Sequence, residues 1–527
     1  MKIVKVTLIS SMVALNLAAM DLGSYMSRIA NSDPNIIQKK KEFNSVYETL
    51  KISEGDLFLP SIDLSAGIDK VKTKHTKPSE ITSKYTNKYF TISATENLFN
   101  GFGTVNDIEA KKAALASMAY SYVQTLNEEL LKASKAYVDL ARNKELLAVE
   151  IDNYKKHKKI MDAISVRNSS GVGIVGDLQE ITAKTNLAYA NYLTQLNNLK
   201  ASQIAVRKFY GVPIDINSVQ IPSVGYELNY TSRDAIAFAF SHNPSIFVQK
   251  YNLIAARYNQ KRDKKEFLPI IDLVLAHSQV DGKDDDTDIE SKYKQLKGGI
   301  SLRWNLFRGF KDVHQKQKNI SLIHHEYQKY EAIKRALAEE IELALTTYKM
   351  QQKEYKYLTQ YVQNADAKLN TITTLFRNGR KSLFEFLASQ TDYNSAKEKL
   401  INTKYDLIFT KLRVLKALGV LSDMVNPALK TEFGISGNGL YDYKMLNYKA
   451  DKLPLVEDNT TPPPVLNTSV VSNSTYNTLN SYEIVGNNYN ITTQYKQIKP
   501  AIQKEARFEN DEKYKNVYDE EFVAPIR

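Results

Sequence analysis

Three short segments hold residue types that bind nucleotides or metal ions in many proteins. Residues 171–176 (GVGIVG) fit the G-x-G-x-x-G spacing of a dinucleotide fingerprint, but that fingerprint follows a strand, and a long helical pattern precedes this one. The aspartate-rich run over 281–288 (DGKDDDTD) lacks the ligand spacing of an EF-hand calcium loop. Residues 324–326 (HHE) lack the H-E-x-x-H spacing of a zinc protease. We therefore predict no cofactor, no metal site and no catalytic residue, so that the chain is not an enzyme.

The composition excludes further classes of protein. The 527 residues include no Cys, which excludes a disulfide scaffold, a cysteine nucleophile and a thiolate metal site. Lys and Arg number 71 against 59 Asp and Glu, which gives a formal net charge of +12. This excess is spread along the chain, whereas a nucleic-acid-binding protein gathers its basic residues in one stripe or patch. We therefore expect no nucleic acid partner.

The first 20 residues have the layout of a secretory signal peptide. Lys2 and Lys5 form a short basic region, an apolar segment follows, and the small residues Ala18 and Ala19 end it. The apolar segment is shorter than the roughly 20 residues that a membrane-spanning helix needs. We predict a secretory signal peptide over 1–20; a buried N-terminal strand or helix is the alternative.

Internal similarity divides most of the chain into two copies of one unit. The landmarks of the first copy recur in the same order at an offset of roughly 210 residues, as expected of a duplication. We predict a first structural repeat over 21–221, a second over 222–424, and a polar, partly disordered C-terminal tail over 425–527. The matching pairs are FLP at 58–60 and 267–269, NLF-x-GF at 97–102 and 305–310, and RN at 167–168 and 377–378.

Each copy has the same order of elements. A helical stretch leads into two alternating stretches, then a very long helical stretch, a glycine-containing turn and a shorter helix. Neither of the longest stretches contains Pro or Gly, which favours coiled-coil packing, and at about 1.5 Å per residue each would span about 100 Å. The function must therefore depend on helices that are much longer than a compact domain is wide. The predicted helices are 22–54, 104–166 and 176–210 in the first copy and 232–266, 311–376 and 382–418 in the second.

The alternating stretches have one apolar and one polar face. Ile62, Leu64, Ala66 and Ile68, for example, alternate with polar residues, which is the period of a β-strand. The pattern fits a half-buried antiparallel sheet, or a membrane β-barrel with an apolar outside and a polar lumen. Four strands cannot close such a barrel, since closed barrels start at about eight, so we favour a barrel shared by several chains. The predicted strands are 61–69, 89–95, about 271–275, and 299–306.

Helix- and strand-breaking residues flank the alternating stretches. Pro60 and Pro269 precede the first strand of each copy, and Gly101 and Gly309 follow the second strand. Proline and glycine at such positions end regular elements and let the chain change direction. We predict that these four residues form the junctions between the barrel and the helices.

The order and duplication of these motifs resemble the TolC-like outer-membrane channel proteins of Gram-negative tripartite efflux pumps and type I secretion systems. The resemblance covers about 22–424 and implies a mainly α-helical chain with membrane β-structure. Three chains would form a homotrimeric twelve-stranded barrel in the lipid of the cell outer membrane, four strands per chain, continued by an α-helical coiled-coil barrel in the periplasm. The motifs are DPN at 33–35, LP at 59–60, NLFNG at 97–101, NLFRG at 305–309 and GRKSLFEFL at 379–387.

The resemblance also implies a function and a gate. The channel would be a passive exit duct, opened when a periplasmic adaptor (membrane fusion) protein and an inner-membrane pump or ABC transporter dock. Its periplasmic gate would lie at the helical hairpin tips, where Gly176 and Ala388 replace a threonine and an acidic residue of the family. The implied gate residues are Asp177, Phe376, Lys381 and Glu385, and the implied tip turns are at Gly171 and Gly379.

Two alternatives stay open at this level. Acidic residues are common in the first turn of ordinary helices because the helix dipole favours them there, so Asp177 and Glu385 could be helix-start residues with no role in a gate. The long helices would also suit a structural periplasmic or surface coiled-coil protein without transport activity. The alternating strands argue against that second alternative.

Overall fold

The chain is described by a computed structural model over residues 20–75, 81–284, 287–426, 428–436, 440–443 and 446. Apart from Met20, the predicted signal peptide over 1–20 lies outside these residues, as does most of the predicted tail over 425–527. Among the helices in these ranges, none is long and apolar enough to cross a membrane.

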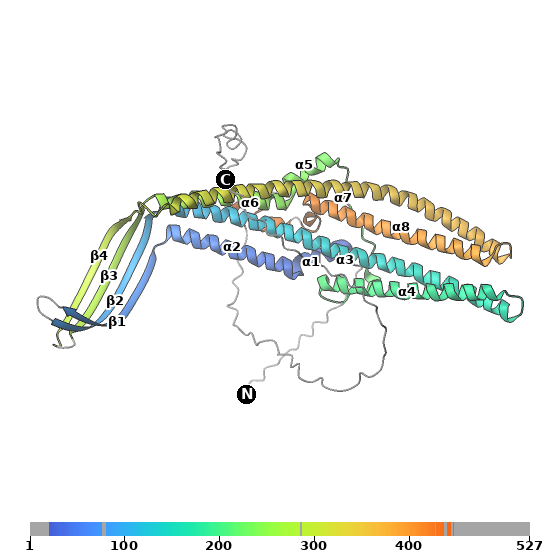
Figure 1. Ribbon diagram of the computed structural model, residues 1–527, viewed down its shortest axis with the longest axis horizontal. Coiled ribbons are helices and arrows are strands. Elements are labelled where there is room, and N and C mark those ends of the chain that lie inside the picture. The colour runs from blue at the N-terminus through green and yellow to red at the C-terminus, as the bar shows by residue number, and fades with distance from the viewer. Residues whose placement is uncertain are drawn as a thin grey trace, which may run out of the picture. The chain divides into compact units, whose positions relative to one another are not determined.

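The long helices are present at nearly their predicted bounds. Helices α3 (Gly103–Ser169) and α7 (Lys311–Arg377) each have 67 residues. Each folds back through a tight turn into a shorter helix of 36 residues, α4 (Val175–Tyr210) or α8 (Leu383–Leu418). In Figure 1 the strands lie at one end of α3 and α7, and the two hairpin turns lie at the other end. Short helical turns also form at Ile216–Ser218, Asp263–Phe267, Ser422–Met424 and, as α9, Ala428–Thr431.

The first helical stretch of each copy is two helices, where the sequence pattern predicted one. In the first copy the break is at Asp33, which is extended (φ −68°, ψ 129°) and accepts hydrogen bonds from the backbone N–H groups of Asn35 and Ile36 at 2.9 and 3.3 Å. Asn243 caps the second copy in the same way. A proline follows each cap at the first helical position, where it costs no hydrogen bond. The helices are α1 (Leu22–Ser32), α2 (Pro34–Phe58), α5 (Ser232–His242) and α6 (Pro244–Arg262).

The strands form one antiparallel sheet in the order β1-β2-β3-β4. Each of the first three extends well beyond its predicted stretch. The fourth ends at Arg303, so the prediction that Trp304 and Leu306 continue it was wrong; the Trp304 indole N–H donates to the Phe267 carbonyl at 3.3 Å, in the link to α7. The strands are β1 (Ser61–His75), β2 (Ile81–Phe99), β3 (Ile270–Asp284) and β4 (Glu290–Arg303).

Helix α3 is the centre of the helical core. It contacts α2, α4, α6 and α8, and many of its buried residues are alanines, which let these neighbours approach closely. Aromatic side chains fill the wider gaps. Phe433, which follows α9, is fully buried with its ring 4.9 Å from Phe43 of α2 and 4.2 Å from Tyr122 of α3. The start of the predicted tail is therefore part of the folded core.

Candidate functional site

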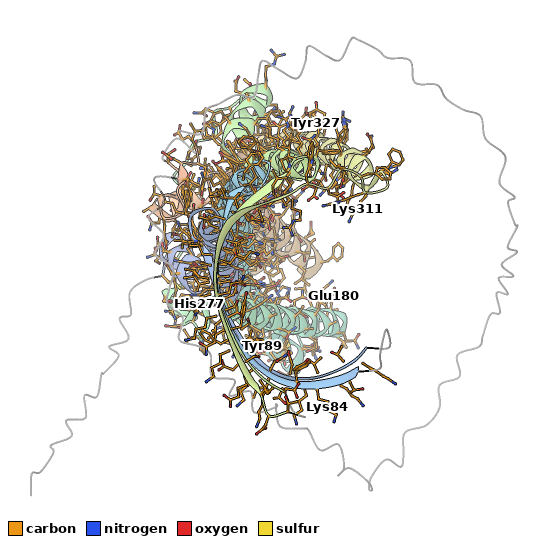
Figure 2. All side chains as sticks on the ribbon, turned by 90° about the vertical axis from the view of Figure 1, so that its left-hand side faces the viewer. Lys84, Tyr89, Glu180, His277, Lys311 and Tyr327 are labelled. Atoms are coloured by element: carbon orange, nitrogen blue, oxygen red, sulfur yellow. The ribbon has the colours of Figure 1, made fainter. Side chains whose placement is uncertain are left out.

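The sheet is curved, and its two faces differ in chemistry. Facing residues of antiparallel strands point to the same side of a sheet, and the register places Ile92 opposite His277. Figure 2 shows His277 and Lys84 on the convex side of the sheet and Tyr89 on its concave side. The apolar residues that share the convex face are Ile62, Leu64, Ala66, Ile68, Phe90, Ile92, Ala94, Ile271, Leu273, Leu275, Leu296, Ile300 and Leu302.

This apolar convex face is not covered by any residue that the structure describes. Ile62 is 69 %, Ile300 70 % and Leu296 83 % exposed. The concave face is mostly polar, with serine, threonine and tyrosine side chains such as Ser65, Thr91 and Tyr89. A sheet with an apolar convex face and a polar concave face has the arrangement of a barrel wall, with lipid outside and water inside.

The sheet also has two open edges. Strands β1 and β4 are at the ends of the order, so each pairs with one neighbour only. Such edges carry unpaired backbone N–H and C=O groups, which in a membrane must be satisfied by another strand. The single chain therefore provides part of a wall and not a closed channel.

The predicted junction residues lie where the chain passes between strands and helices. Pro60 lies between α2 and β1, and Pro269 precedes β3. Gly101 has φ 64°, and a Cβ atom on it would come within 2.9 Å of the Lys265 Cα atom, so only glycine fits this approach between the two copies. Gly309 has φ 59°.

Sequence reasoning missed the residue after each junction glycine. Phe102 and Phe310 have φ 62° and 61°, in the left-handed region that costs a non-glycine residue about 1–2 kcal/mol. Each packs edge-on against a phenylalanine three residues earlier, at 5.4 Å between ring centroids. The NLF-x-GF motif contains both phenylalanines, so the repeated motif was the available signal.

At the other end of the helices, an apolar cluster joins the two hairpin tips. Its members come from α3, α4, α7 and α8, so the α3/α4 hairpin is packed against the α7/α8 hairpin within one chain. Gly171 and Gly379, the residues of the predicted tip turns, have φ 73° and 71°, in the left-handed region that favours glycine. The buried members of the cluster are Ile164, Ile181, Leu369, Leu383, Phe386 and Leu387.

Glu385 is held at the start of α8 by its own chain. Ser382 and Glu385 form a capping box: the Ser382 hydroxyl accepts from the Glu385 backbone N–H, and the Glu385 carboxylate accepts from the Ser382 backbone N–H at 3.1 Å. The Lys381 ammonium donates to the same carboxylate at 2.6 Å. The Lys381 hydrogen bond and the capping box lower the pKa of Glu385 to about 2. Glu385 therefore stays ionised, with a lysine beside it.

The other two predicted gate residues have simpler surroundings. Phe376 is half-buried in the tip cluster and stacks on Phe386, 5.2 Å away, so it joins α7 to α8 by an apolar contact. Asp177 lies in the first turn of α4, and its side chain makes no hydrogen bond or ion pair with any residue that the structure describes. The structure thus brings Lys381 and Glu385 together, while Asp177 stands apart from them on the other hairpin.

A second polar cluster, between α3 and α8, was not predicted. Glu150 and Asn153 of α3 are buried, and the Asn394 side chain of α8 donates to the Asn153 side chain at 2.5 Å. Glu398 lies one turn further along α8. Burial, and then the nearby Glu150 carboxyl, raise the pKa of Glu398 to about 7. Polar residues inside a long apolar helix pattern were the available signal, but only the pairing of α3 with α8 shows that they meet.

Comparison with known proteins places these features in a family. The family described as outer membrane efflux protein matches residues 29–212 and 236–420, one segment in each predicted repeat. The outer membrane protein TolC of Vibrio cholerae is 22 % identical over 424 residues, which are 78 % of this chain and 94 % of that protein.

Solved channel structures share the fold. The CmeC outer membrane channel of Campylobacter jejuni aligns with a TM-score of 0.64 at 17 % identity, over 76 % of this chain and 86 % of that one. The open state of the MtrE outer membrane channel of Neisseria gonorrhoeae aligns with a TM-score of 0.60 at 14 % identity, over 78 % and 93 %. The chain therefore belongs to the outer membrane efflux protein family, as a TolC-like efflux channel that lies in the outer membrane and extends into the periplasm, and not as a purely structural coiled coil.

Proposed function

We propose that three copies of this chain close a twelve-stranded barrel, and that the lumen continues between their helical hairpins as a passive exit duct. The observation that carries this proposal is the open sheet: two unpaired edges, an exposed apolar convex face and a polar concave face in the same four strands. A closed ring removes the open edges, because cyclic symmetry brings the free edge of β1 in one copy against the free edge of β4 in the next copy. Two copies would supply only about eight strands, whose interior side chains can fill, so we propose three.

The proposal includes partners that supply the energy. These are a periplasmic adaptor protein and an inner-membrane pump or ABC transporter, as in a tripartite efflux pump or a type I secretion system. The hairpin tips support this, because they lie furthest from the strands (Figure 1) and expose apolar side chains. Val172 is 82 %, Ile174 69 % and Phe384 74 % exposed. Exposed apolar residues on a helical tip suit a helical partner that docks on them.

The same tips are the proposed site of closure. In a three-fold ring, Asp177, Lys381 and Glu385 would each occur three times around the axis. The pairing of Lys381 with Glu385 supports a weak cation preference, because each carboxylate has a positive charge 2.6 Å away. Phe376 would hold its hairpin together by the stack on Phe386. Opening would then require the two hairpins of each chain to move against each other at the tip cluster.

The test is a measurement of single-channel conductance in a planar bilayer, with the mass of the detergent-solubilised particle determined on the same preparation. We expect a particle of three chains and small, cation-biased openings. A three-chain particle that never conducts would contradict the proposed exit duct but would still support the assembly of three chains. A monomer or dimer would contradict the twelve-stranded barrel.

A further inference from the structure

The convex face of the sheet changes character along the strands. In β1 the apolar residues end at Ile68, and the next positions on the same face are Lys70, Lys72 and Lys74, because alternate residues of a strand point the same way. In Figure 1 this end of the strands is the one furthest from the helices. A lysine-rich zone therefore follows directly on the apolar zone.

The neighbouring strands continue this zone at the same level. The register places Lys72 opposite Lys84, and it places Asp281 between Lys88 and Lys292. Asp281 and Glu290 are the carboxylates of the zone. We call its lysines the lysine band: Lys70, Lys72, Lys74, Lys84, Lys88, Lys283, Lys292 and Lys294.

The concave face does not share this excess of positive charge. Its carboxylates outnumber its basic residues in the described parts of the four strands. A solvated end of a hairpin would show no such difference between the two sides, since both sides would meet only water. The carboxylates of the concave face are Asp63, Asp69, Asp272 and Asp284, and its basic residues are Lys297 and Arg303.

Half of the lysine band has no partner among the residues that the structure describes. Lys283 pairs with Asp288 at 2.6 Å, and the Lys292 ammonium is 4.0 Å from the Glu290 carboxylate. Four other lysines are exposed and make neither a hydrogen bond nor an ion pair with a described residue. These four are Lys70, Lys72, Lys88 and Lys294.

The position of the lysine band relative to the membrane indicates which ligand it binds. The helices extend into the periplasm, so the opposite end of the apolar zone faces the outer leaflet of the membrane. Lysines just beyond an apolar membrane surface lie at the depth of the lipid headgroups, with their aliphatic stems along the apolar zone. The anionic groups at that depth are phosphates, and basic clusters next to a membrane-spanning segment recognise them.

We propose that the lysine band binds the phosphate groups of outer-leaflet lipids, and that in the assembled ring it forms a belt around the barrel. This inference rests on the proposed function, because it needs the convex face to be the lipid face. The belt would fix the depth of the barrel in the membrane. The apolar zone would lie in the hydrocarbon core, and the lysines would lie among the headgroups of the outer leaflet.

The test measures lipid binding to the full-length channel in detergent micelles by native mass spectrometry. The probes are phosphatidylglycerol, which is anionic, and phosphatidylcholine, which has no net charge. The test variant replaces the four unpartnered lysines by glutamine, K70Q/K72Q/K88Q/K294Q. The control variant removes the same charge from exposed positions of α3 and α4, as K155Q/K158Q/K159Q/K200Q.

We expect the wild-type channel and the control variant to prefer phosphatidylglycerol, and the test variant to bind it at least about tenfold less tightly, since one lysine near an anionic surface contributes about fivefold. Raising the salt from about 50 to 200 mM should weaken the wild-type preference, because the charges are exposed. Equal binding by the test variant, or an equal loss in the control variant, would overturn the inference. If inorganic phosphate at low millimolar concentration displaces phosphatidylglycerol, the lysine band is a site for free phosphate, and the lipid proposal is wrong.

Conductance in phosphatidylcholine bilayers separates this inference from the proposed function. We expect all three proteins to form channels there, since the lysine band is on the lipid side and not in the lumen. If the wild-type protein forms no channel, the proposed function fails. If it conducts but shows no preference for the anionic lipid, only the lysine band proposal fails.

Discussion

The polar cluster between α3 and α8 leads to a prediction about pH. Glu398 of α8 is half-buried beside Glu150 of α3, and its pKa is raised from 4.5 to about 7 by burial and by the Glu150 carboxyl. The folded state therefore holds a proton on Glu398 between about pH 4.5 and 7, where the unfolded state does not. Stability that comes from this proton is present below pH 4.5 and is lost as the pH rises to about 7.

The Glu398→Gln substitution should remove this dependence. The raised pKa corresponds to at most about 3.5 kcal/mol of destabilisation above pH 7, at about 1.4 kcal/mol per pKa unit. Because Glu398 is only half-buried, solvent screening reduces this to about 1–2 kcal/mol. Glutamine is neutral at every pH and can still donate a hydrogen bond to Glu150. At pH 8 the variant should therefore hold α3 and α8 together more firmly than the wild-type protein does, and at pH 4.5 the two should be alike.

Hydrogen–deuterium exchange in the facing segments of α3 and α8 measures this difference. At pH 8, after correction for intrinsic rates, protection in E398Q should rise by about five- to thirtyfold, the ratio that 1–2 kcal/mol represents. The His157 imidazole of the same cluster has a lowered pKa because it is buried, so its protonation opposes folding at acidic pH. It does so in both proteins, and the difference between them isolates Glu398.

Two further variants make the prediction refutable. Glu150→Gln should give the same gain at pH 8, and the double variant should add little to either single variant, because each removes the same repulsion. Glu342→Gln removes an exposed carboxylate from α7 and should change nothing. Equal protection of wild-type protein and E398Q at pH 8, or an equal gain at pH 4.5, would show that the two carboxyls do not share a proton in this cluster.

Three further predictions concern the tip charges and the packing. In bilayers, Lys381→Gln should raise the cation preference of the channel by a few-fold, and Glu385→Gln should lower or reverse it, because each leaves its partner's charge uncompensated at the tip. Gly419→Ala should destabilise the protein by at least about 1–2 kcal/mol in thermal unfolding, since Gly419 has φ 83° and the added Cβ would be 2.7 Å from the Asn243 Cα atom. Phe433→Ala should cost about 3–5 kcal/mol, because the ring is fully buried between α2 and α3.

Matched controls separate these effects from general damage. Gly55→Ala lies in α2 with no atom within 4 Å of the added Cβ, so it should be neutral or stabilising by up to about 1 kcal/mol. Phe384→Ala removes a phenylalanine that is 74 % exposed and should leave the unfolding temperature unchanged. An unchanged ion preference in both K381Q and E385Q would remove these residues from the pore lining without removing the channel. Equal stability of F433A and F384A would mean that the segment after α9 does not belong to the core.

The sequence alone predicted the internal repeat, the order of the helices and strands, and a barrel wall with one apolar and one polar face. Periods of two and of about 3.6 residues are local properties, and they predicted the bounds of α3, α4, α7 and α8 to within a few residues. The family model supports the duplication and the channel, while the repeat boundaries at 221 and 222 and the gate residues stay predictions. The break at Asp33 was missed because a cap followed by proline is one short signal inside a longer helical pattern.

Only the tertiary structure decided which distant residues meet. Glu150 and Glu398 come together because α3 packs against α8, a choice between helices whose apolar patterns look alike in sequence. The lysines of four strands share one face because the register aligns them, and a shift of one residue in any strand would send its lysines to the other side. Periodicity determines which residues of one element share a face, but packing and register determine what that face meets. The amino-acid sequence therefore identified the kind of object, and the fold determined where its charges lie.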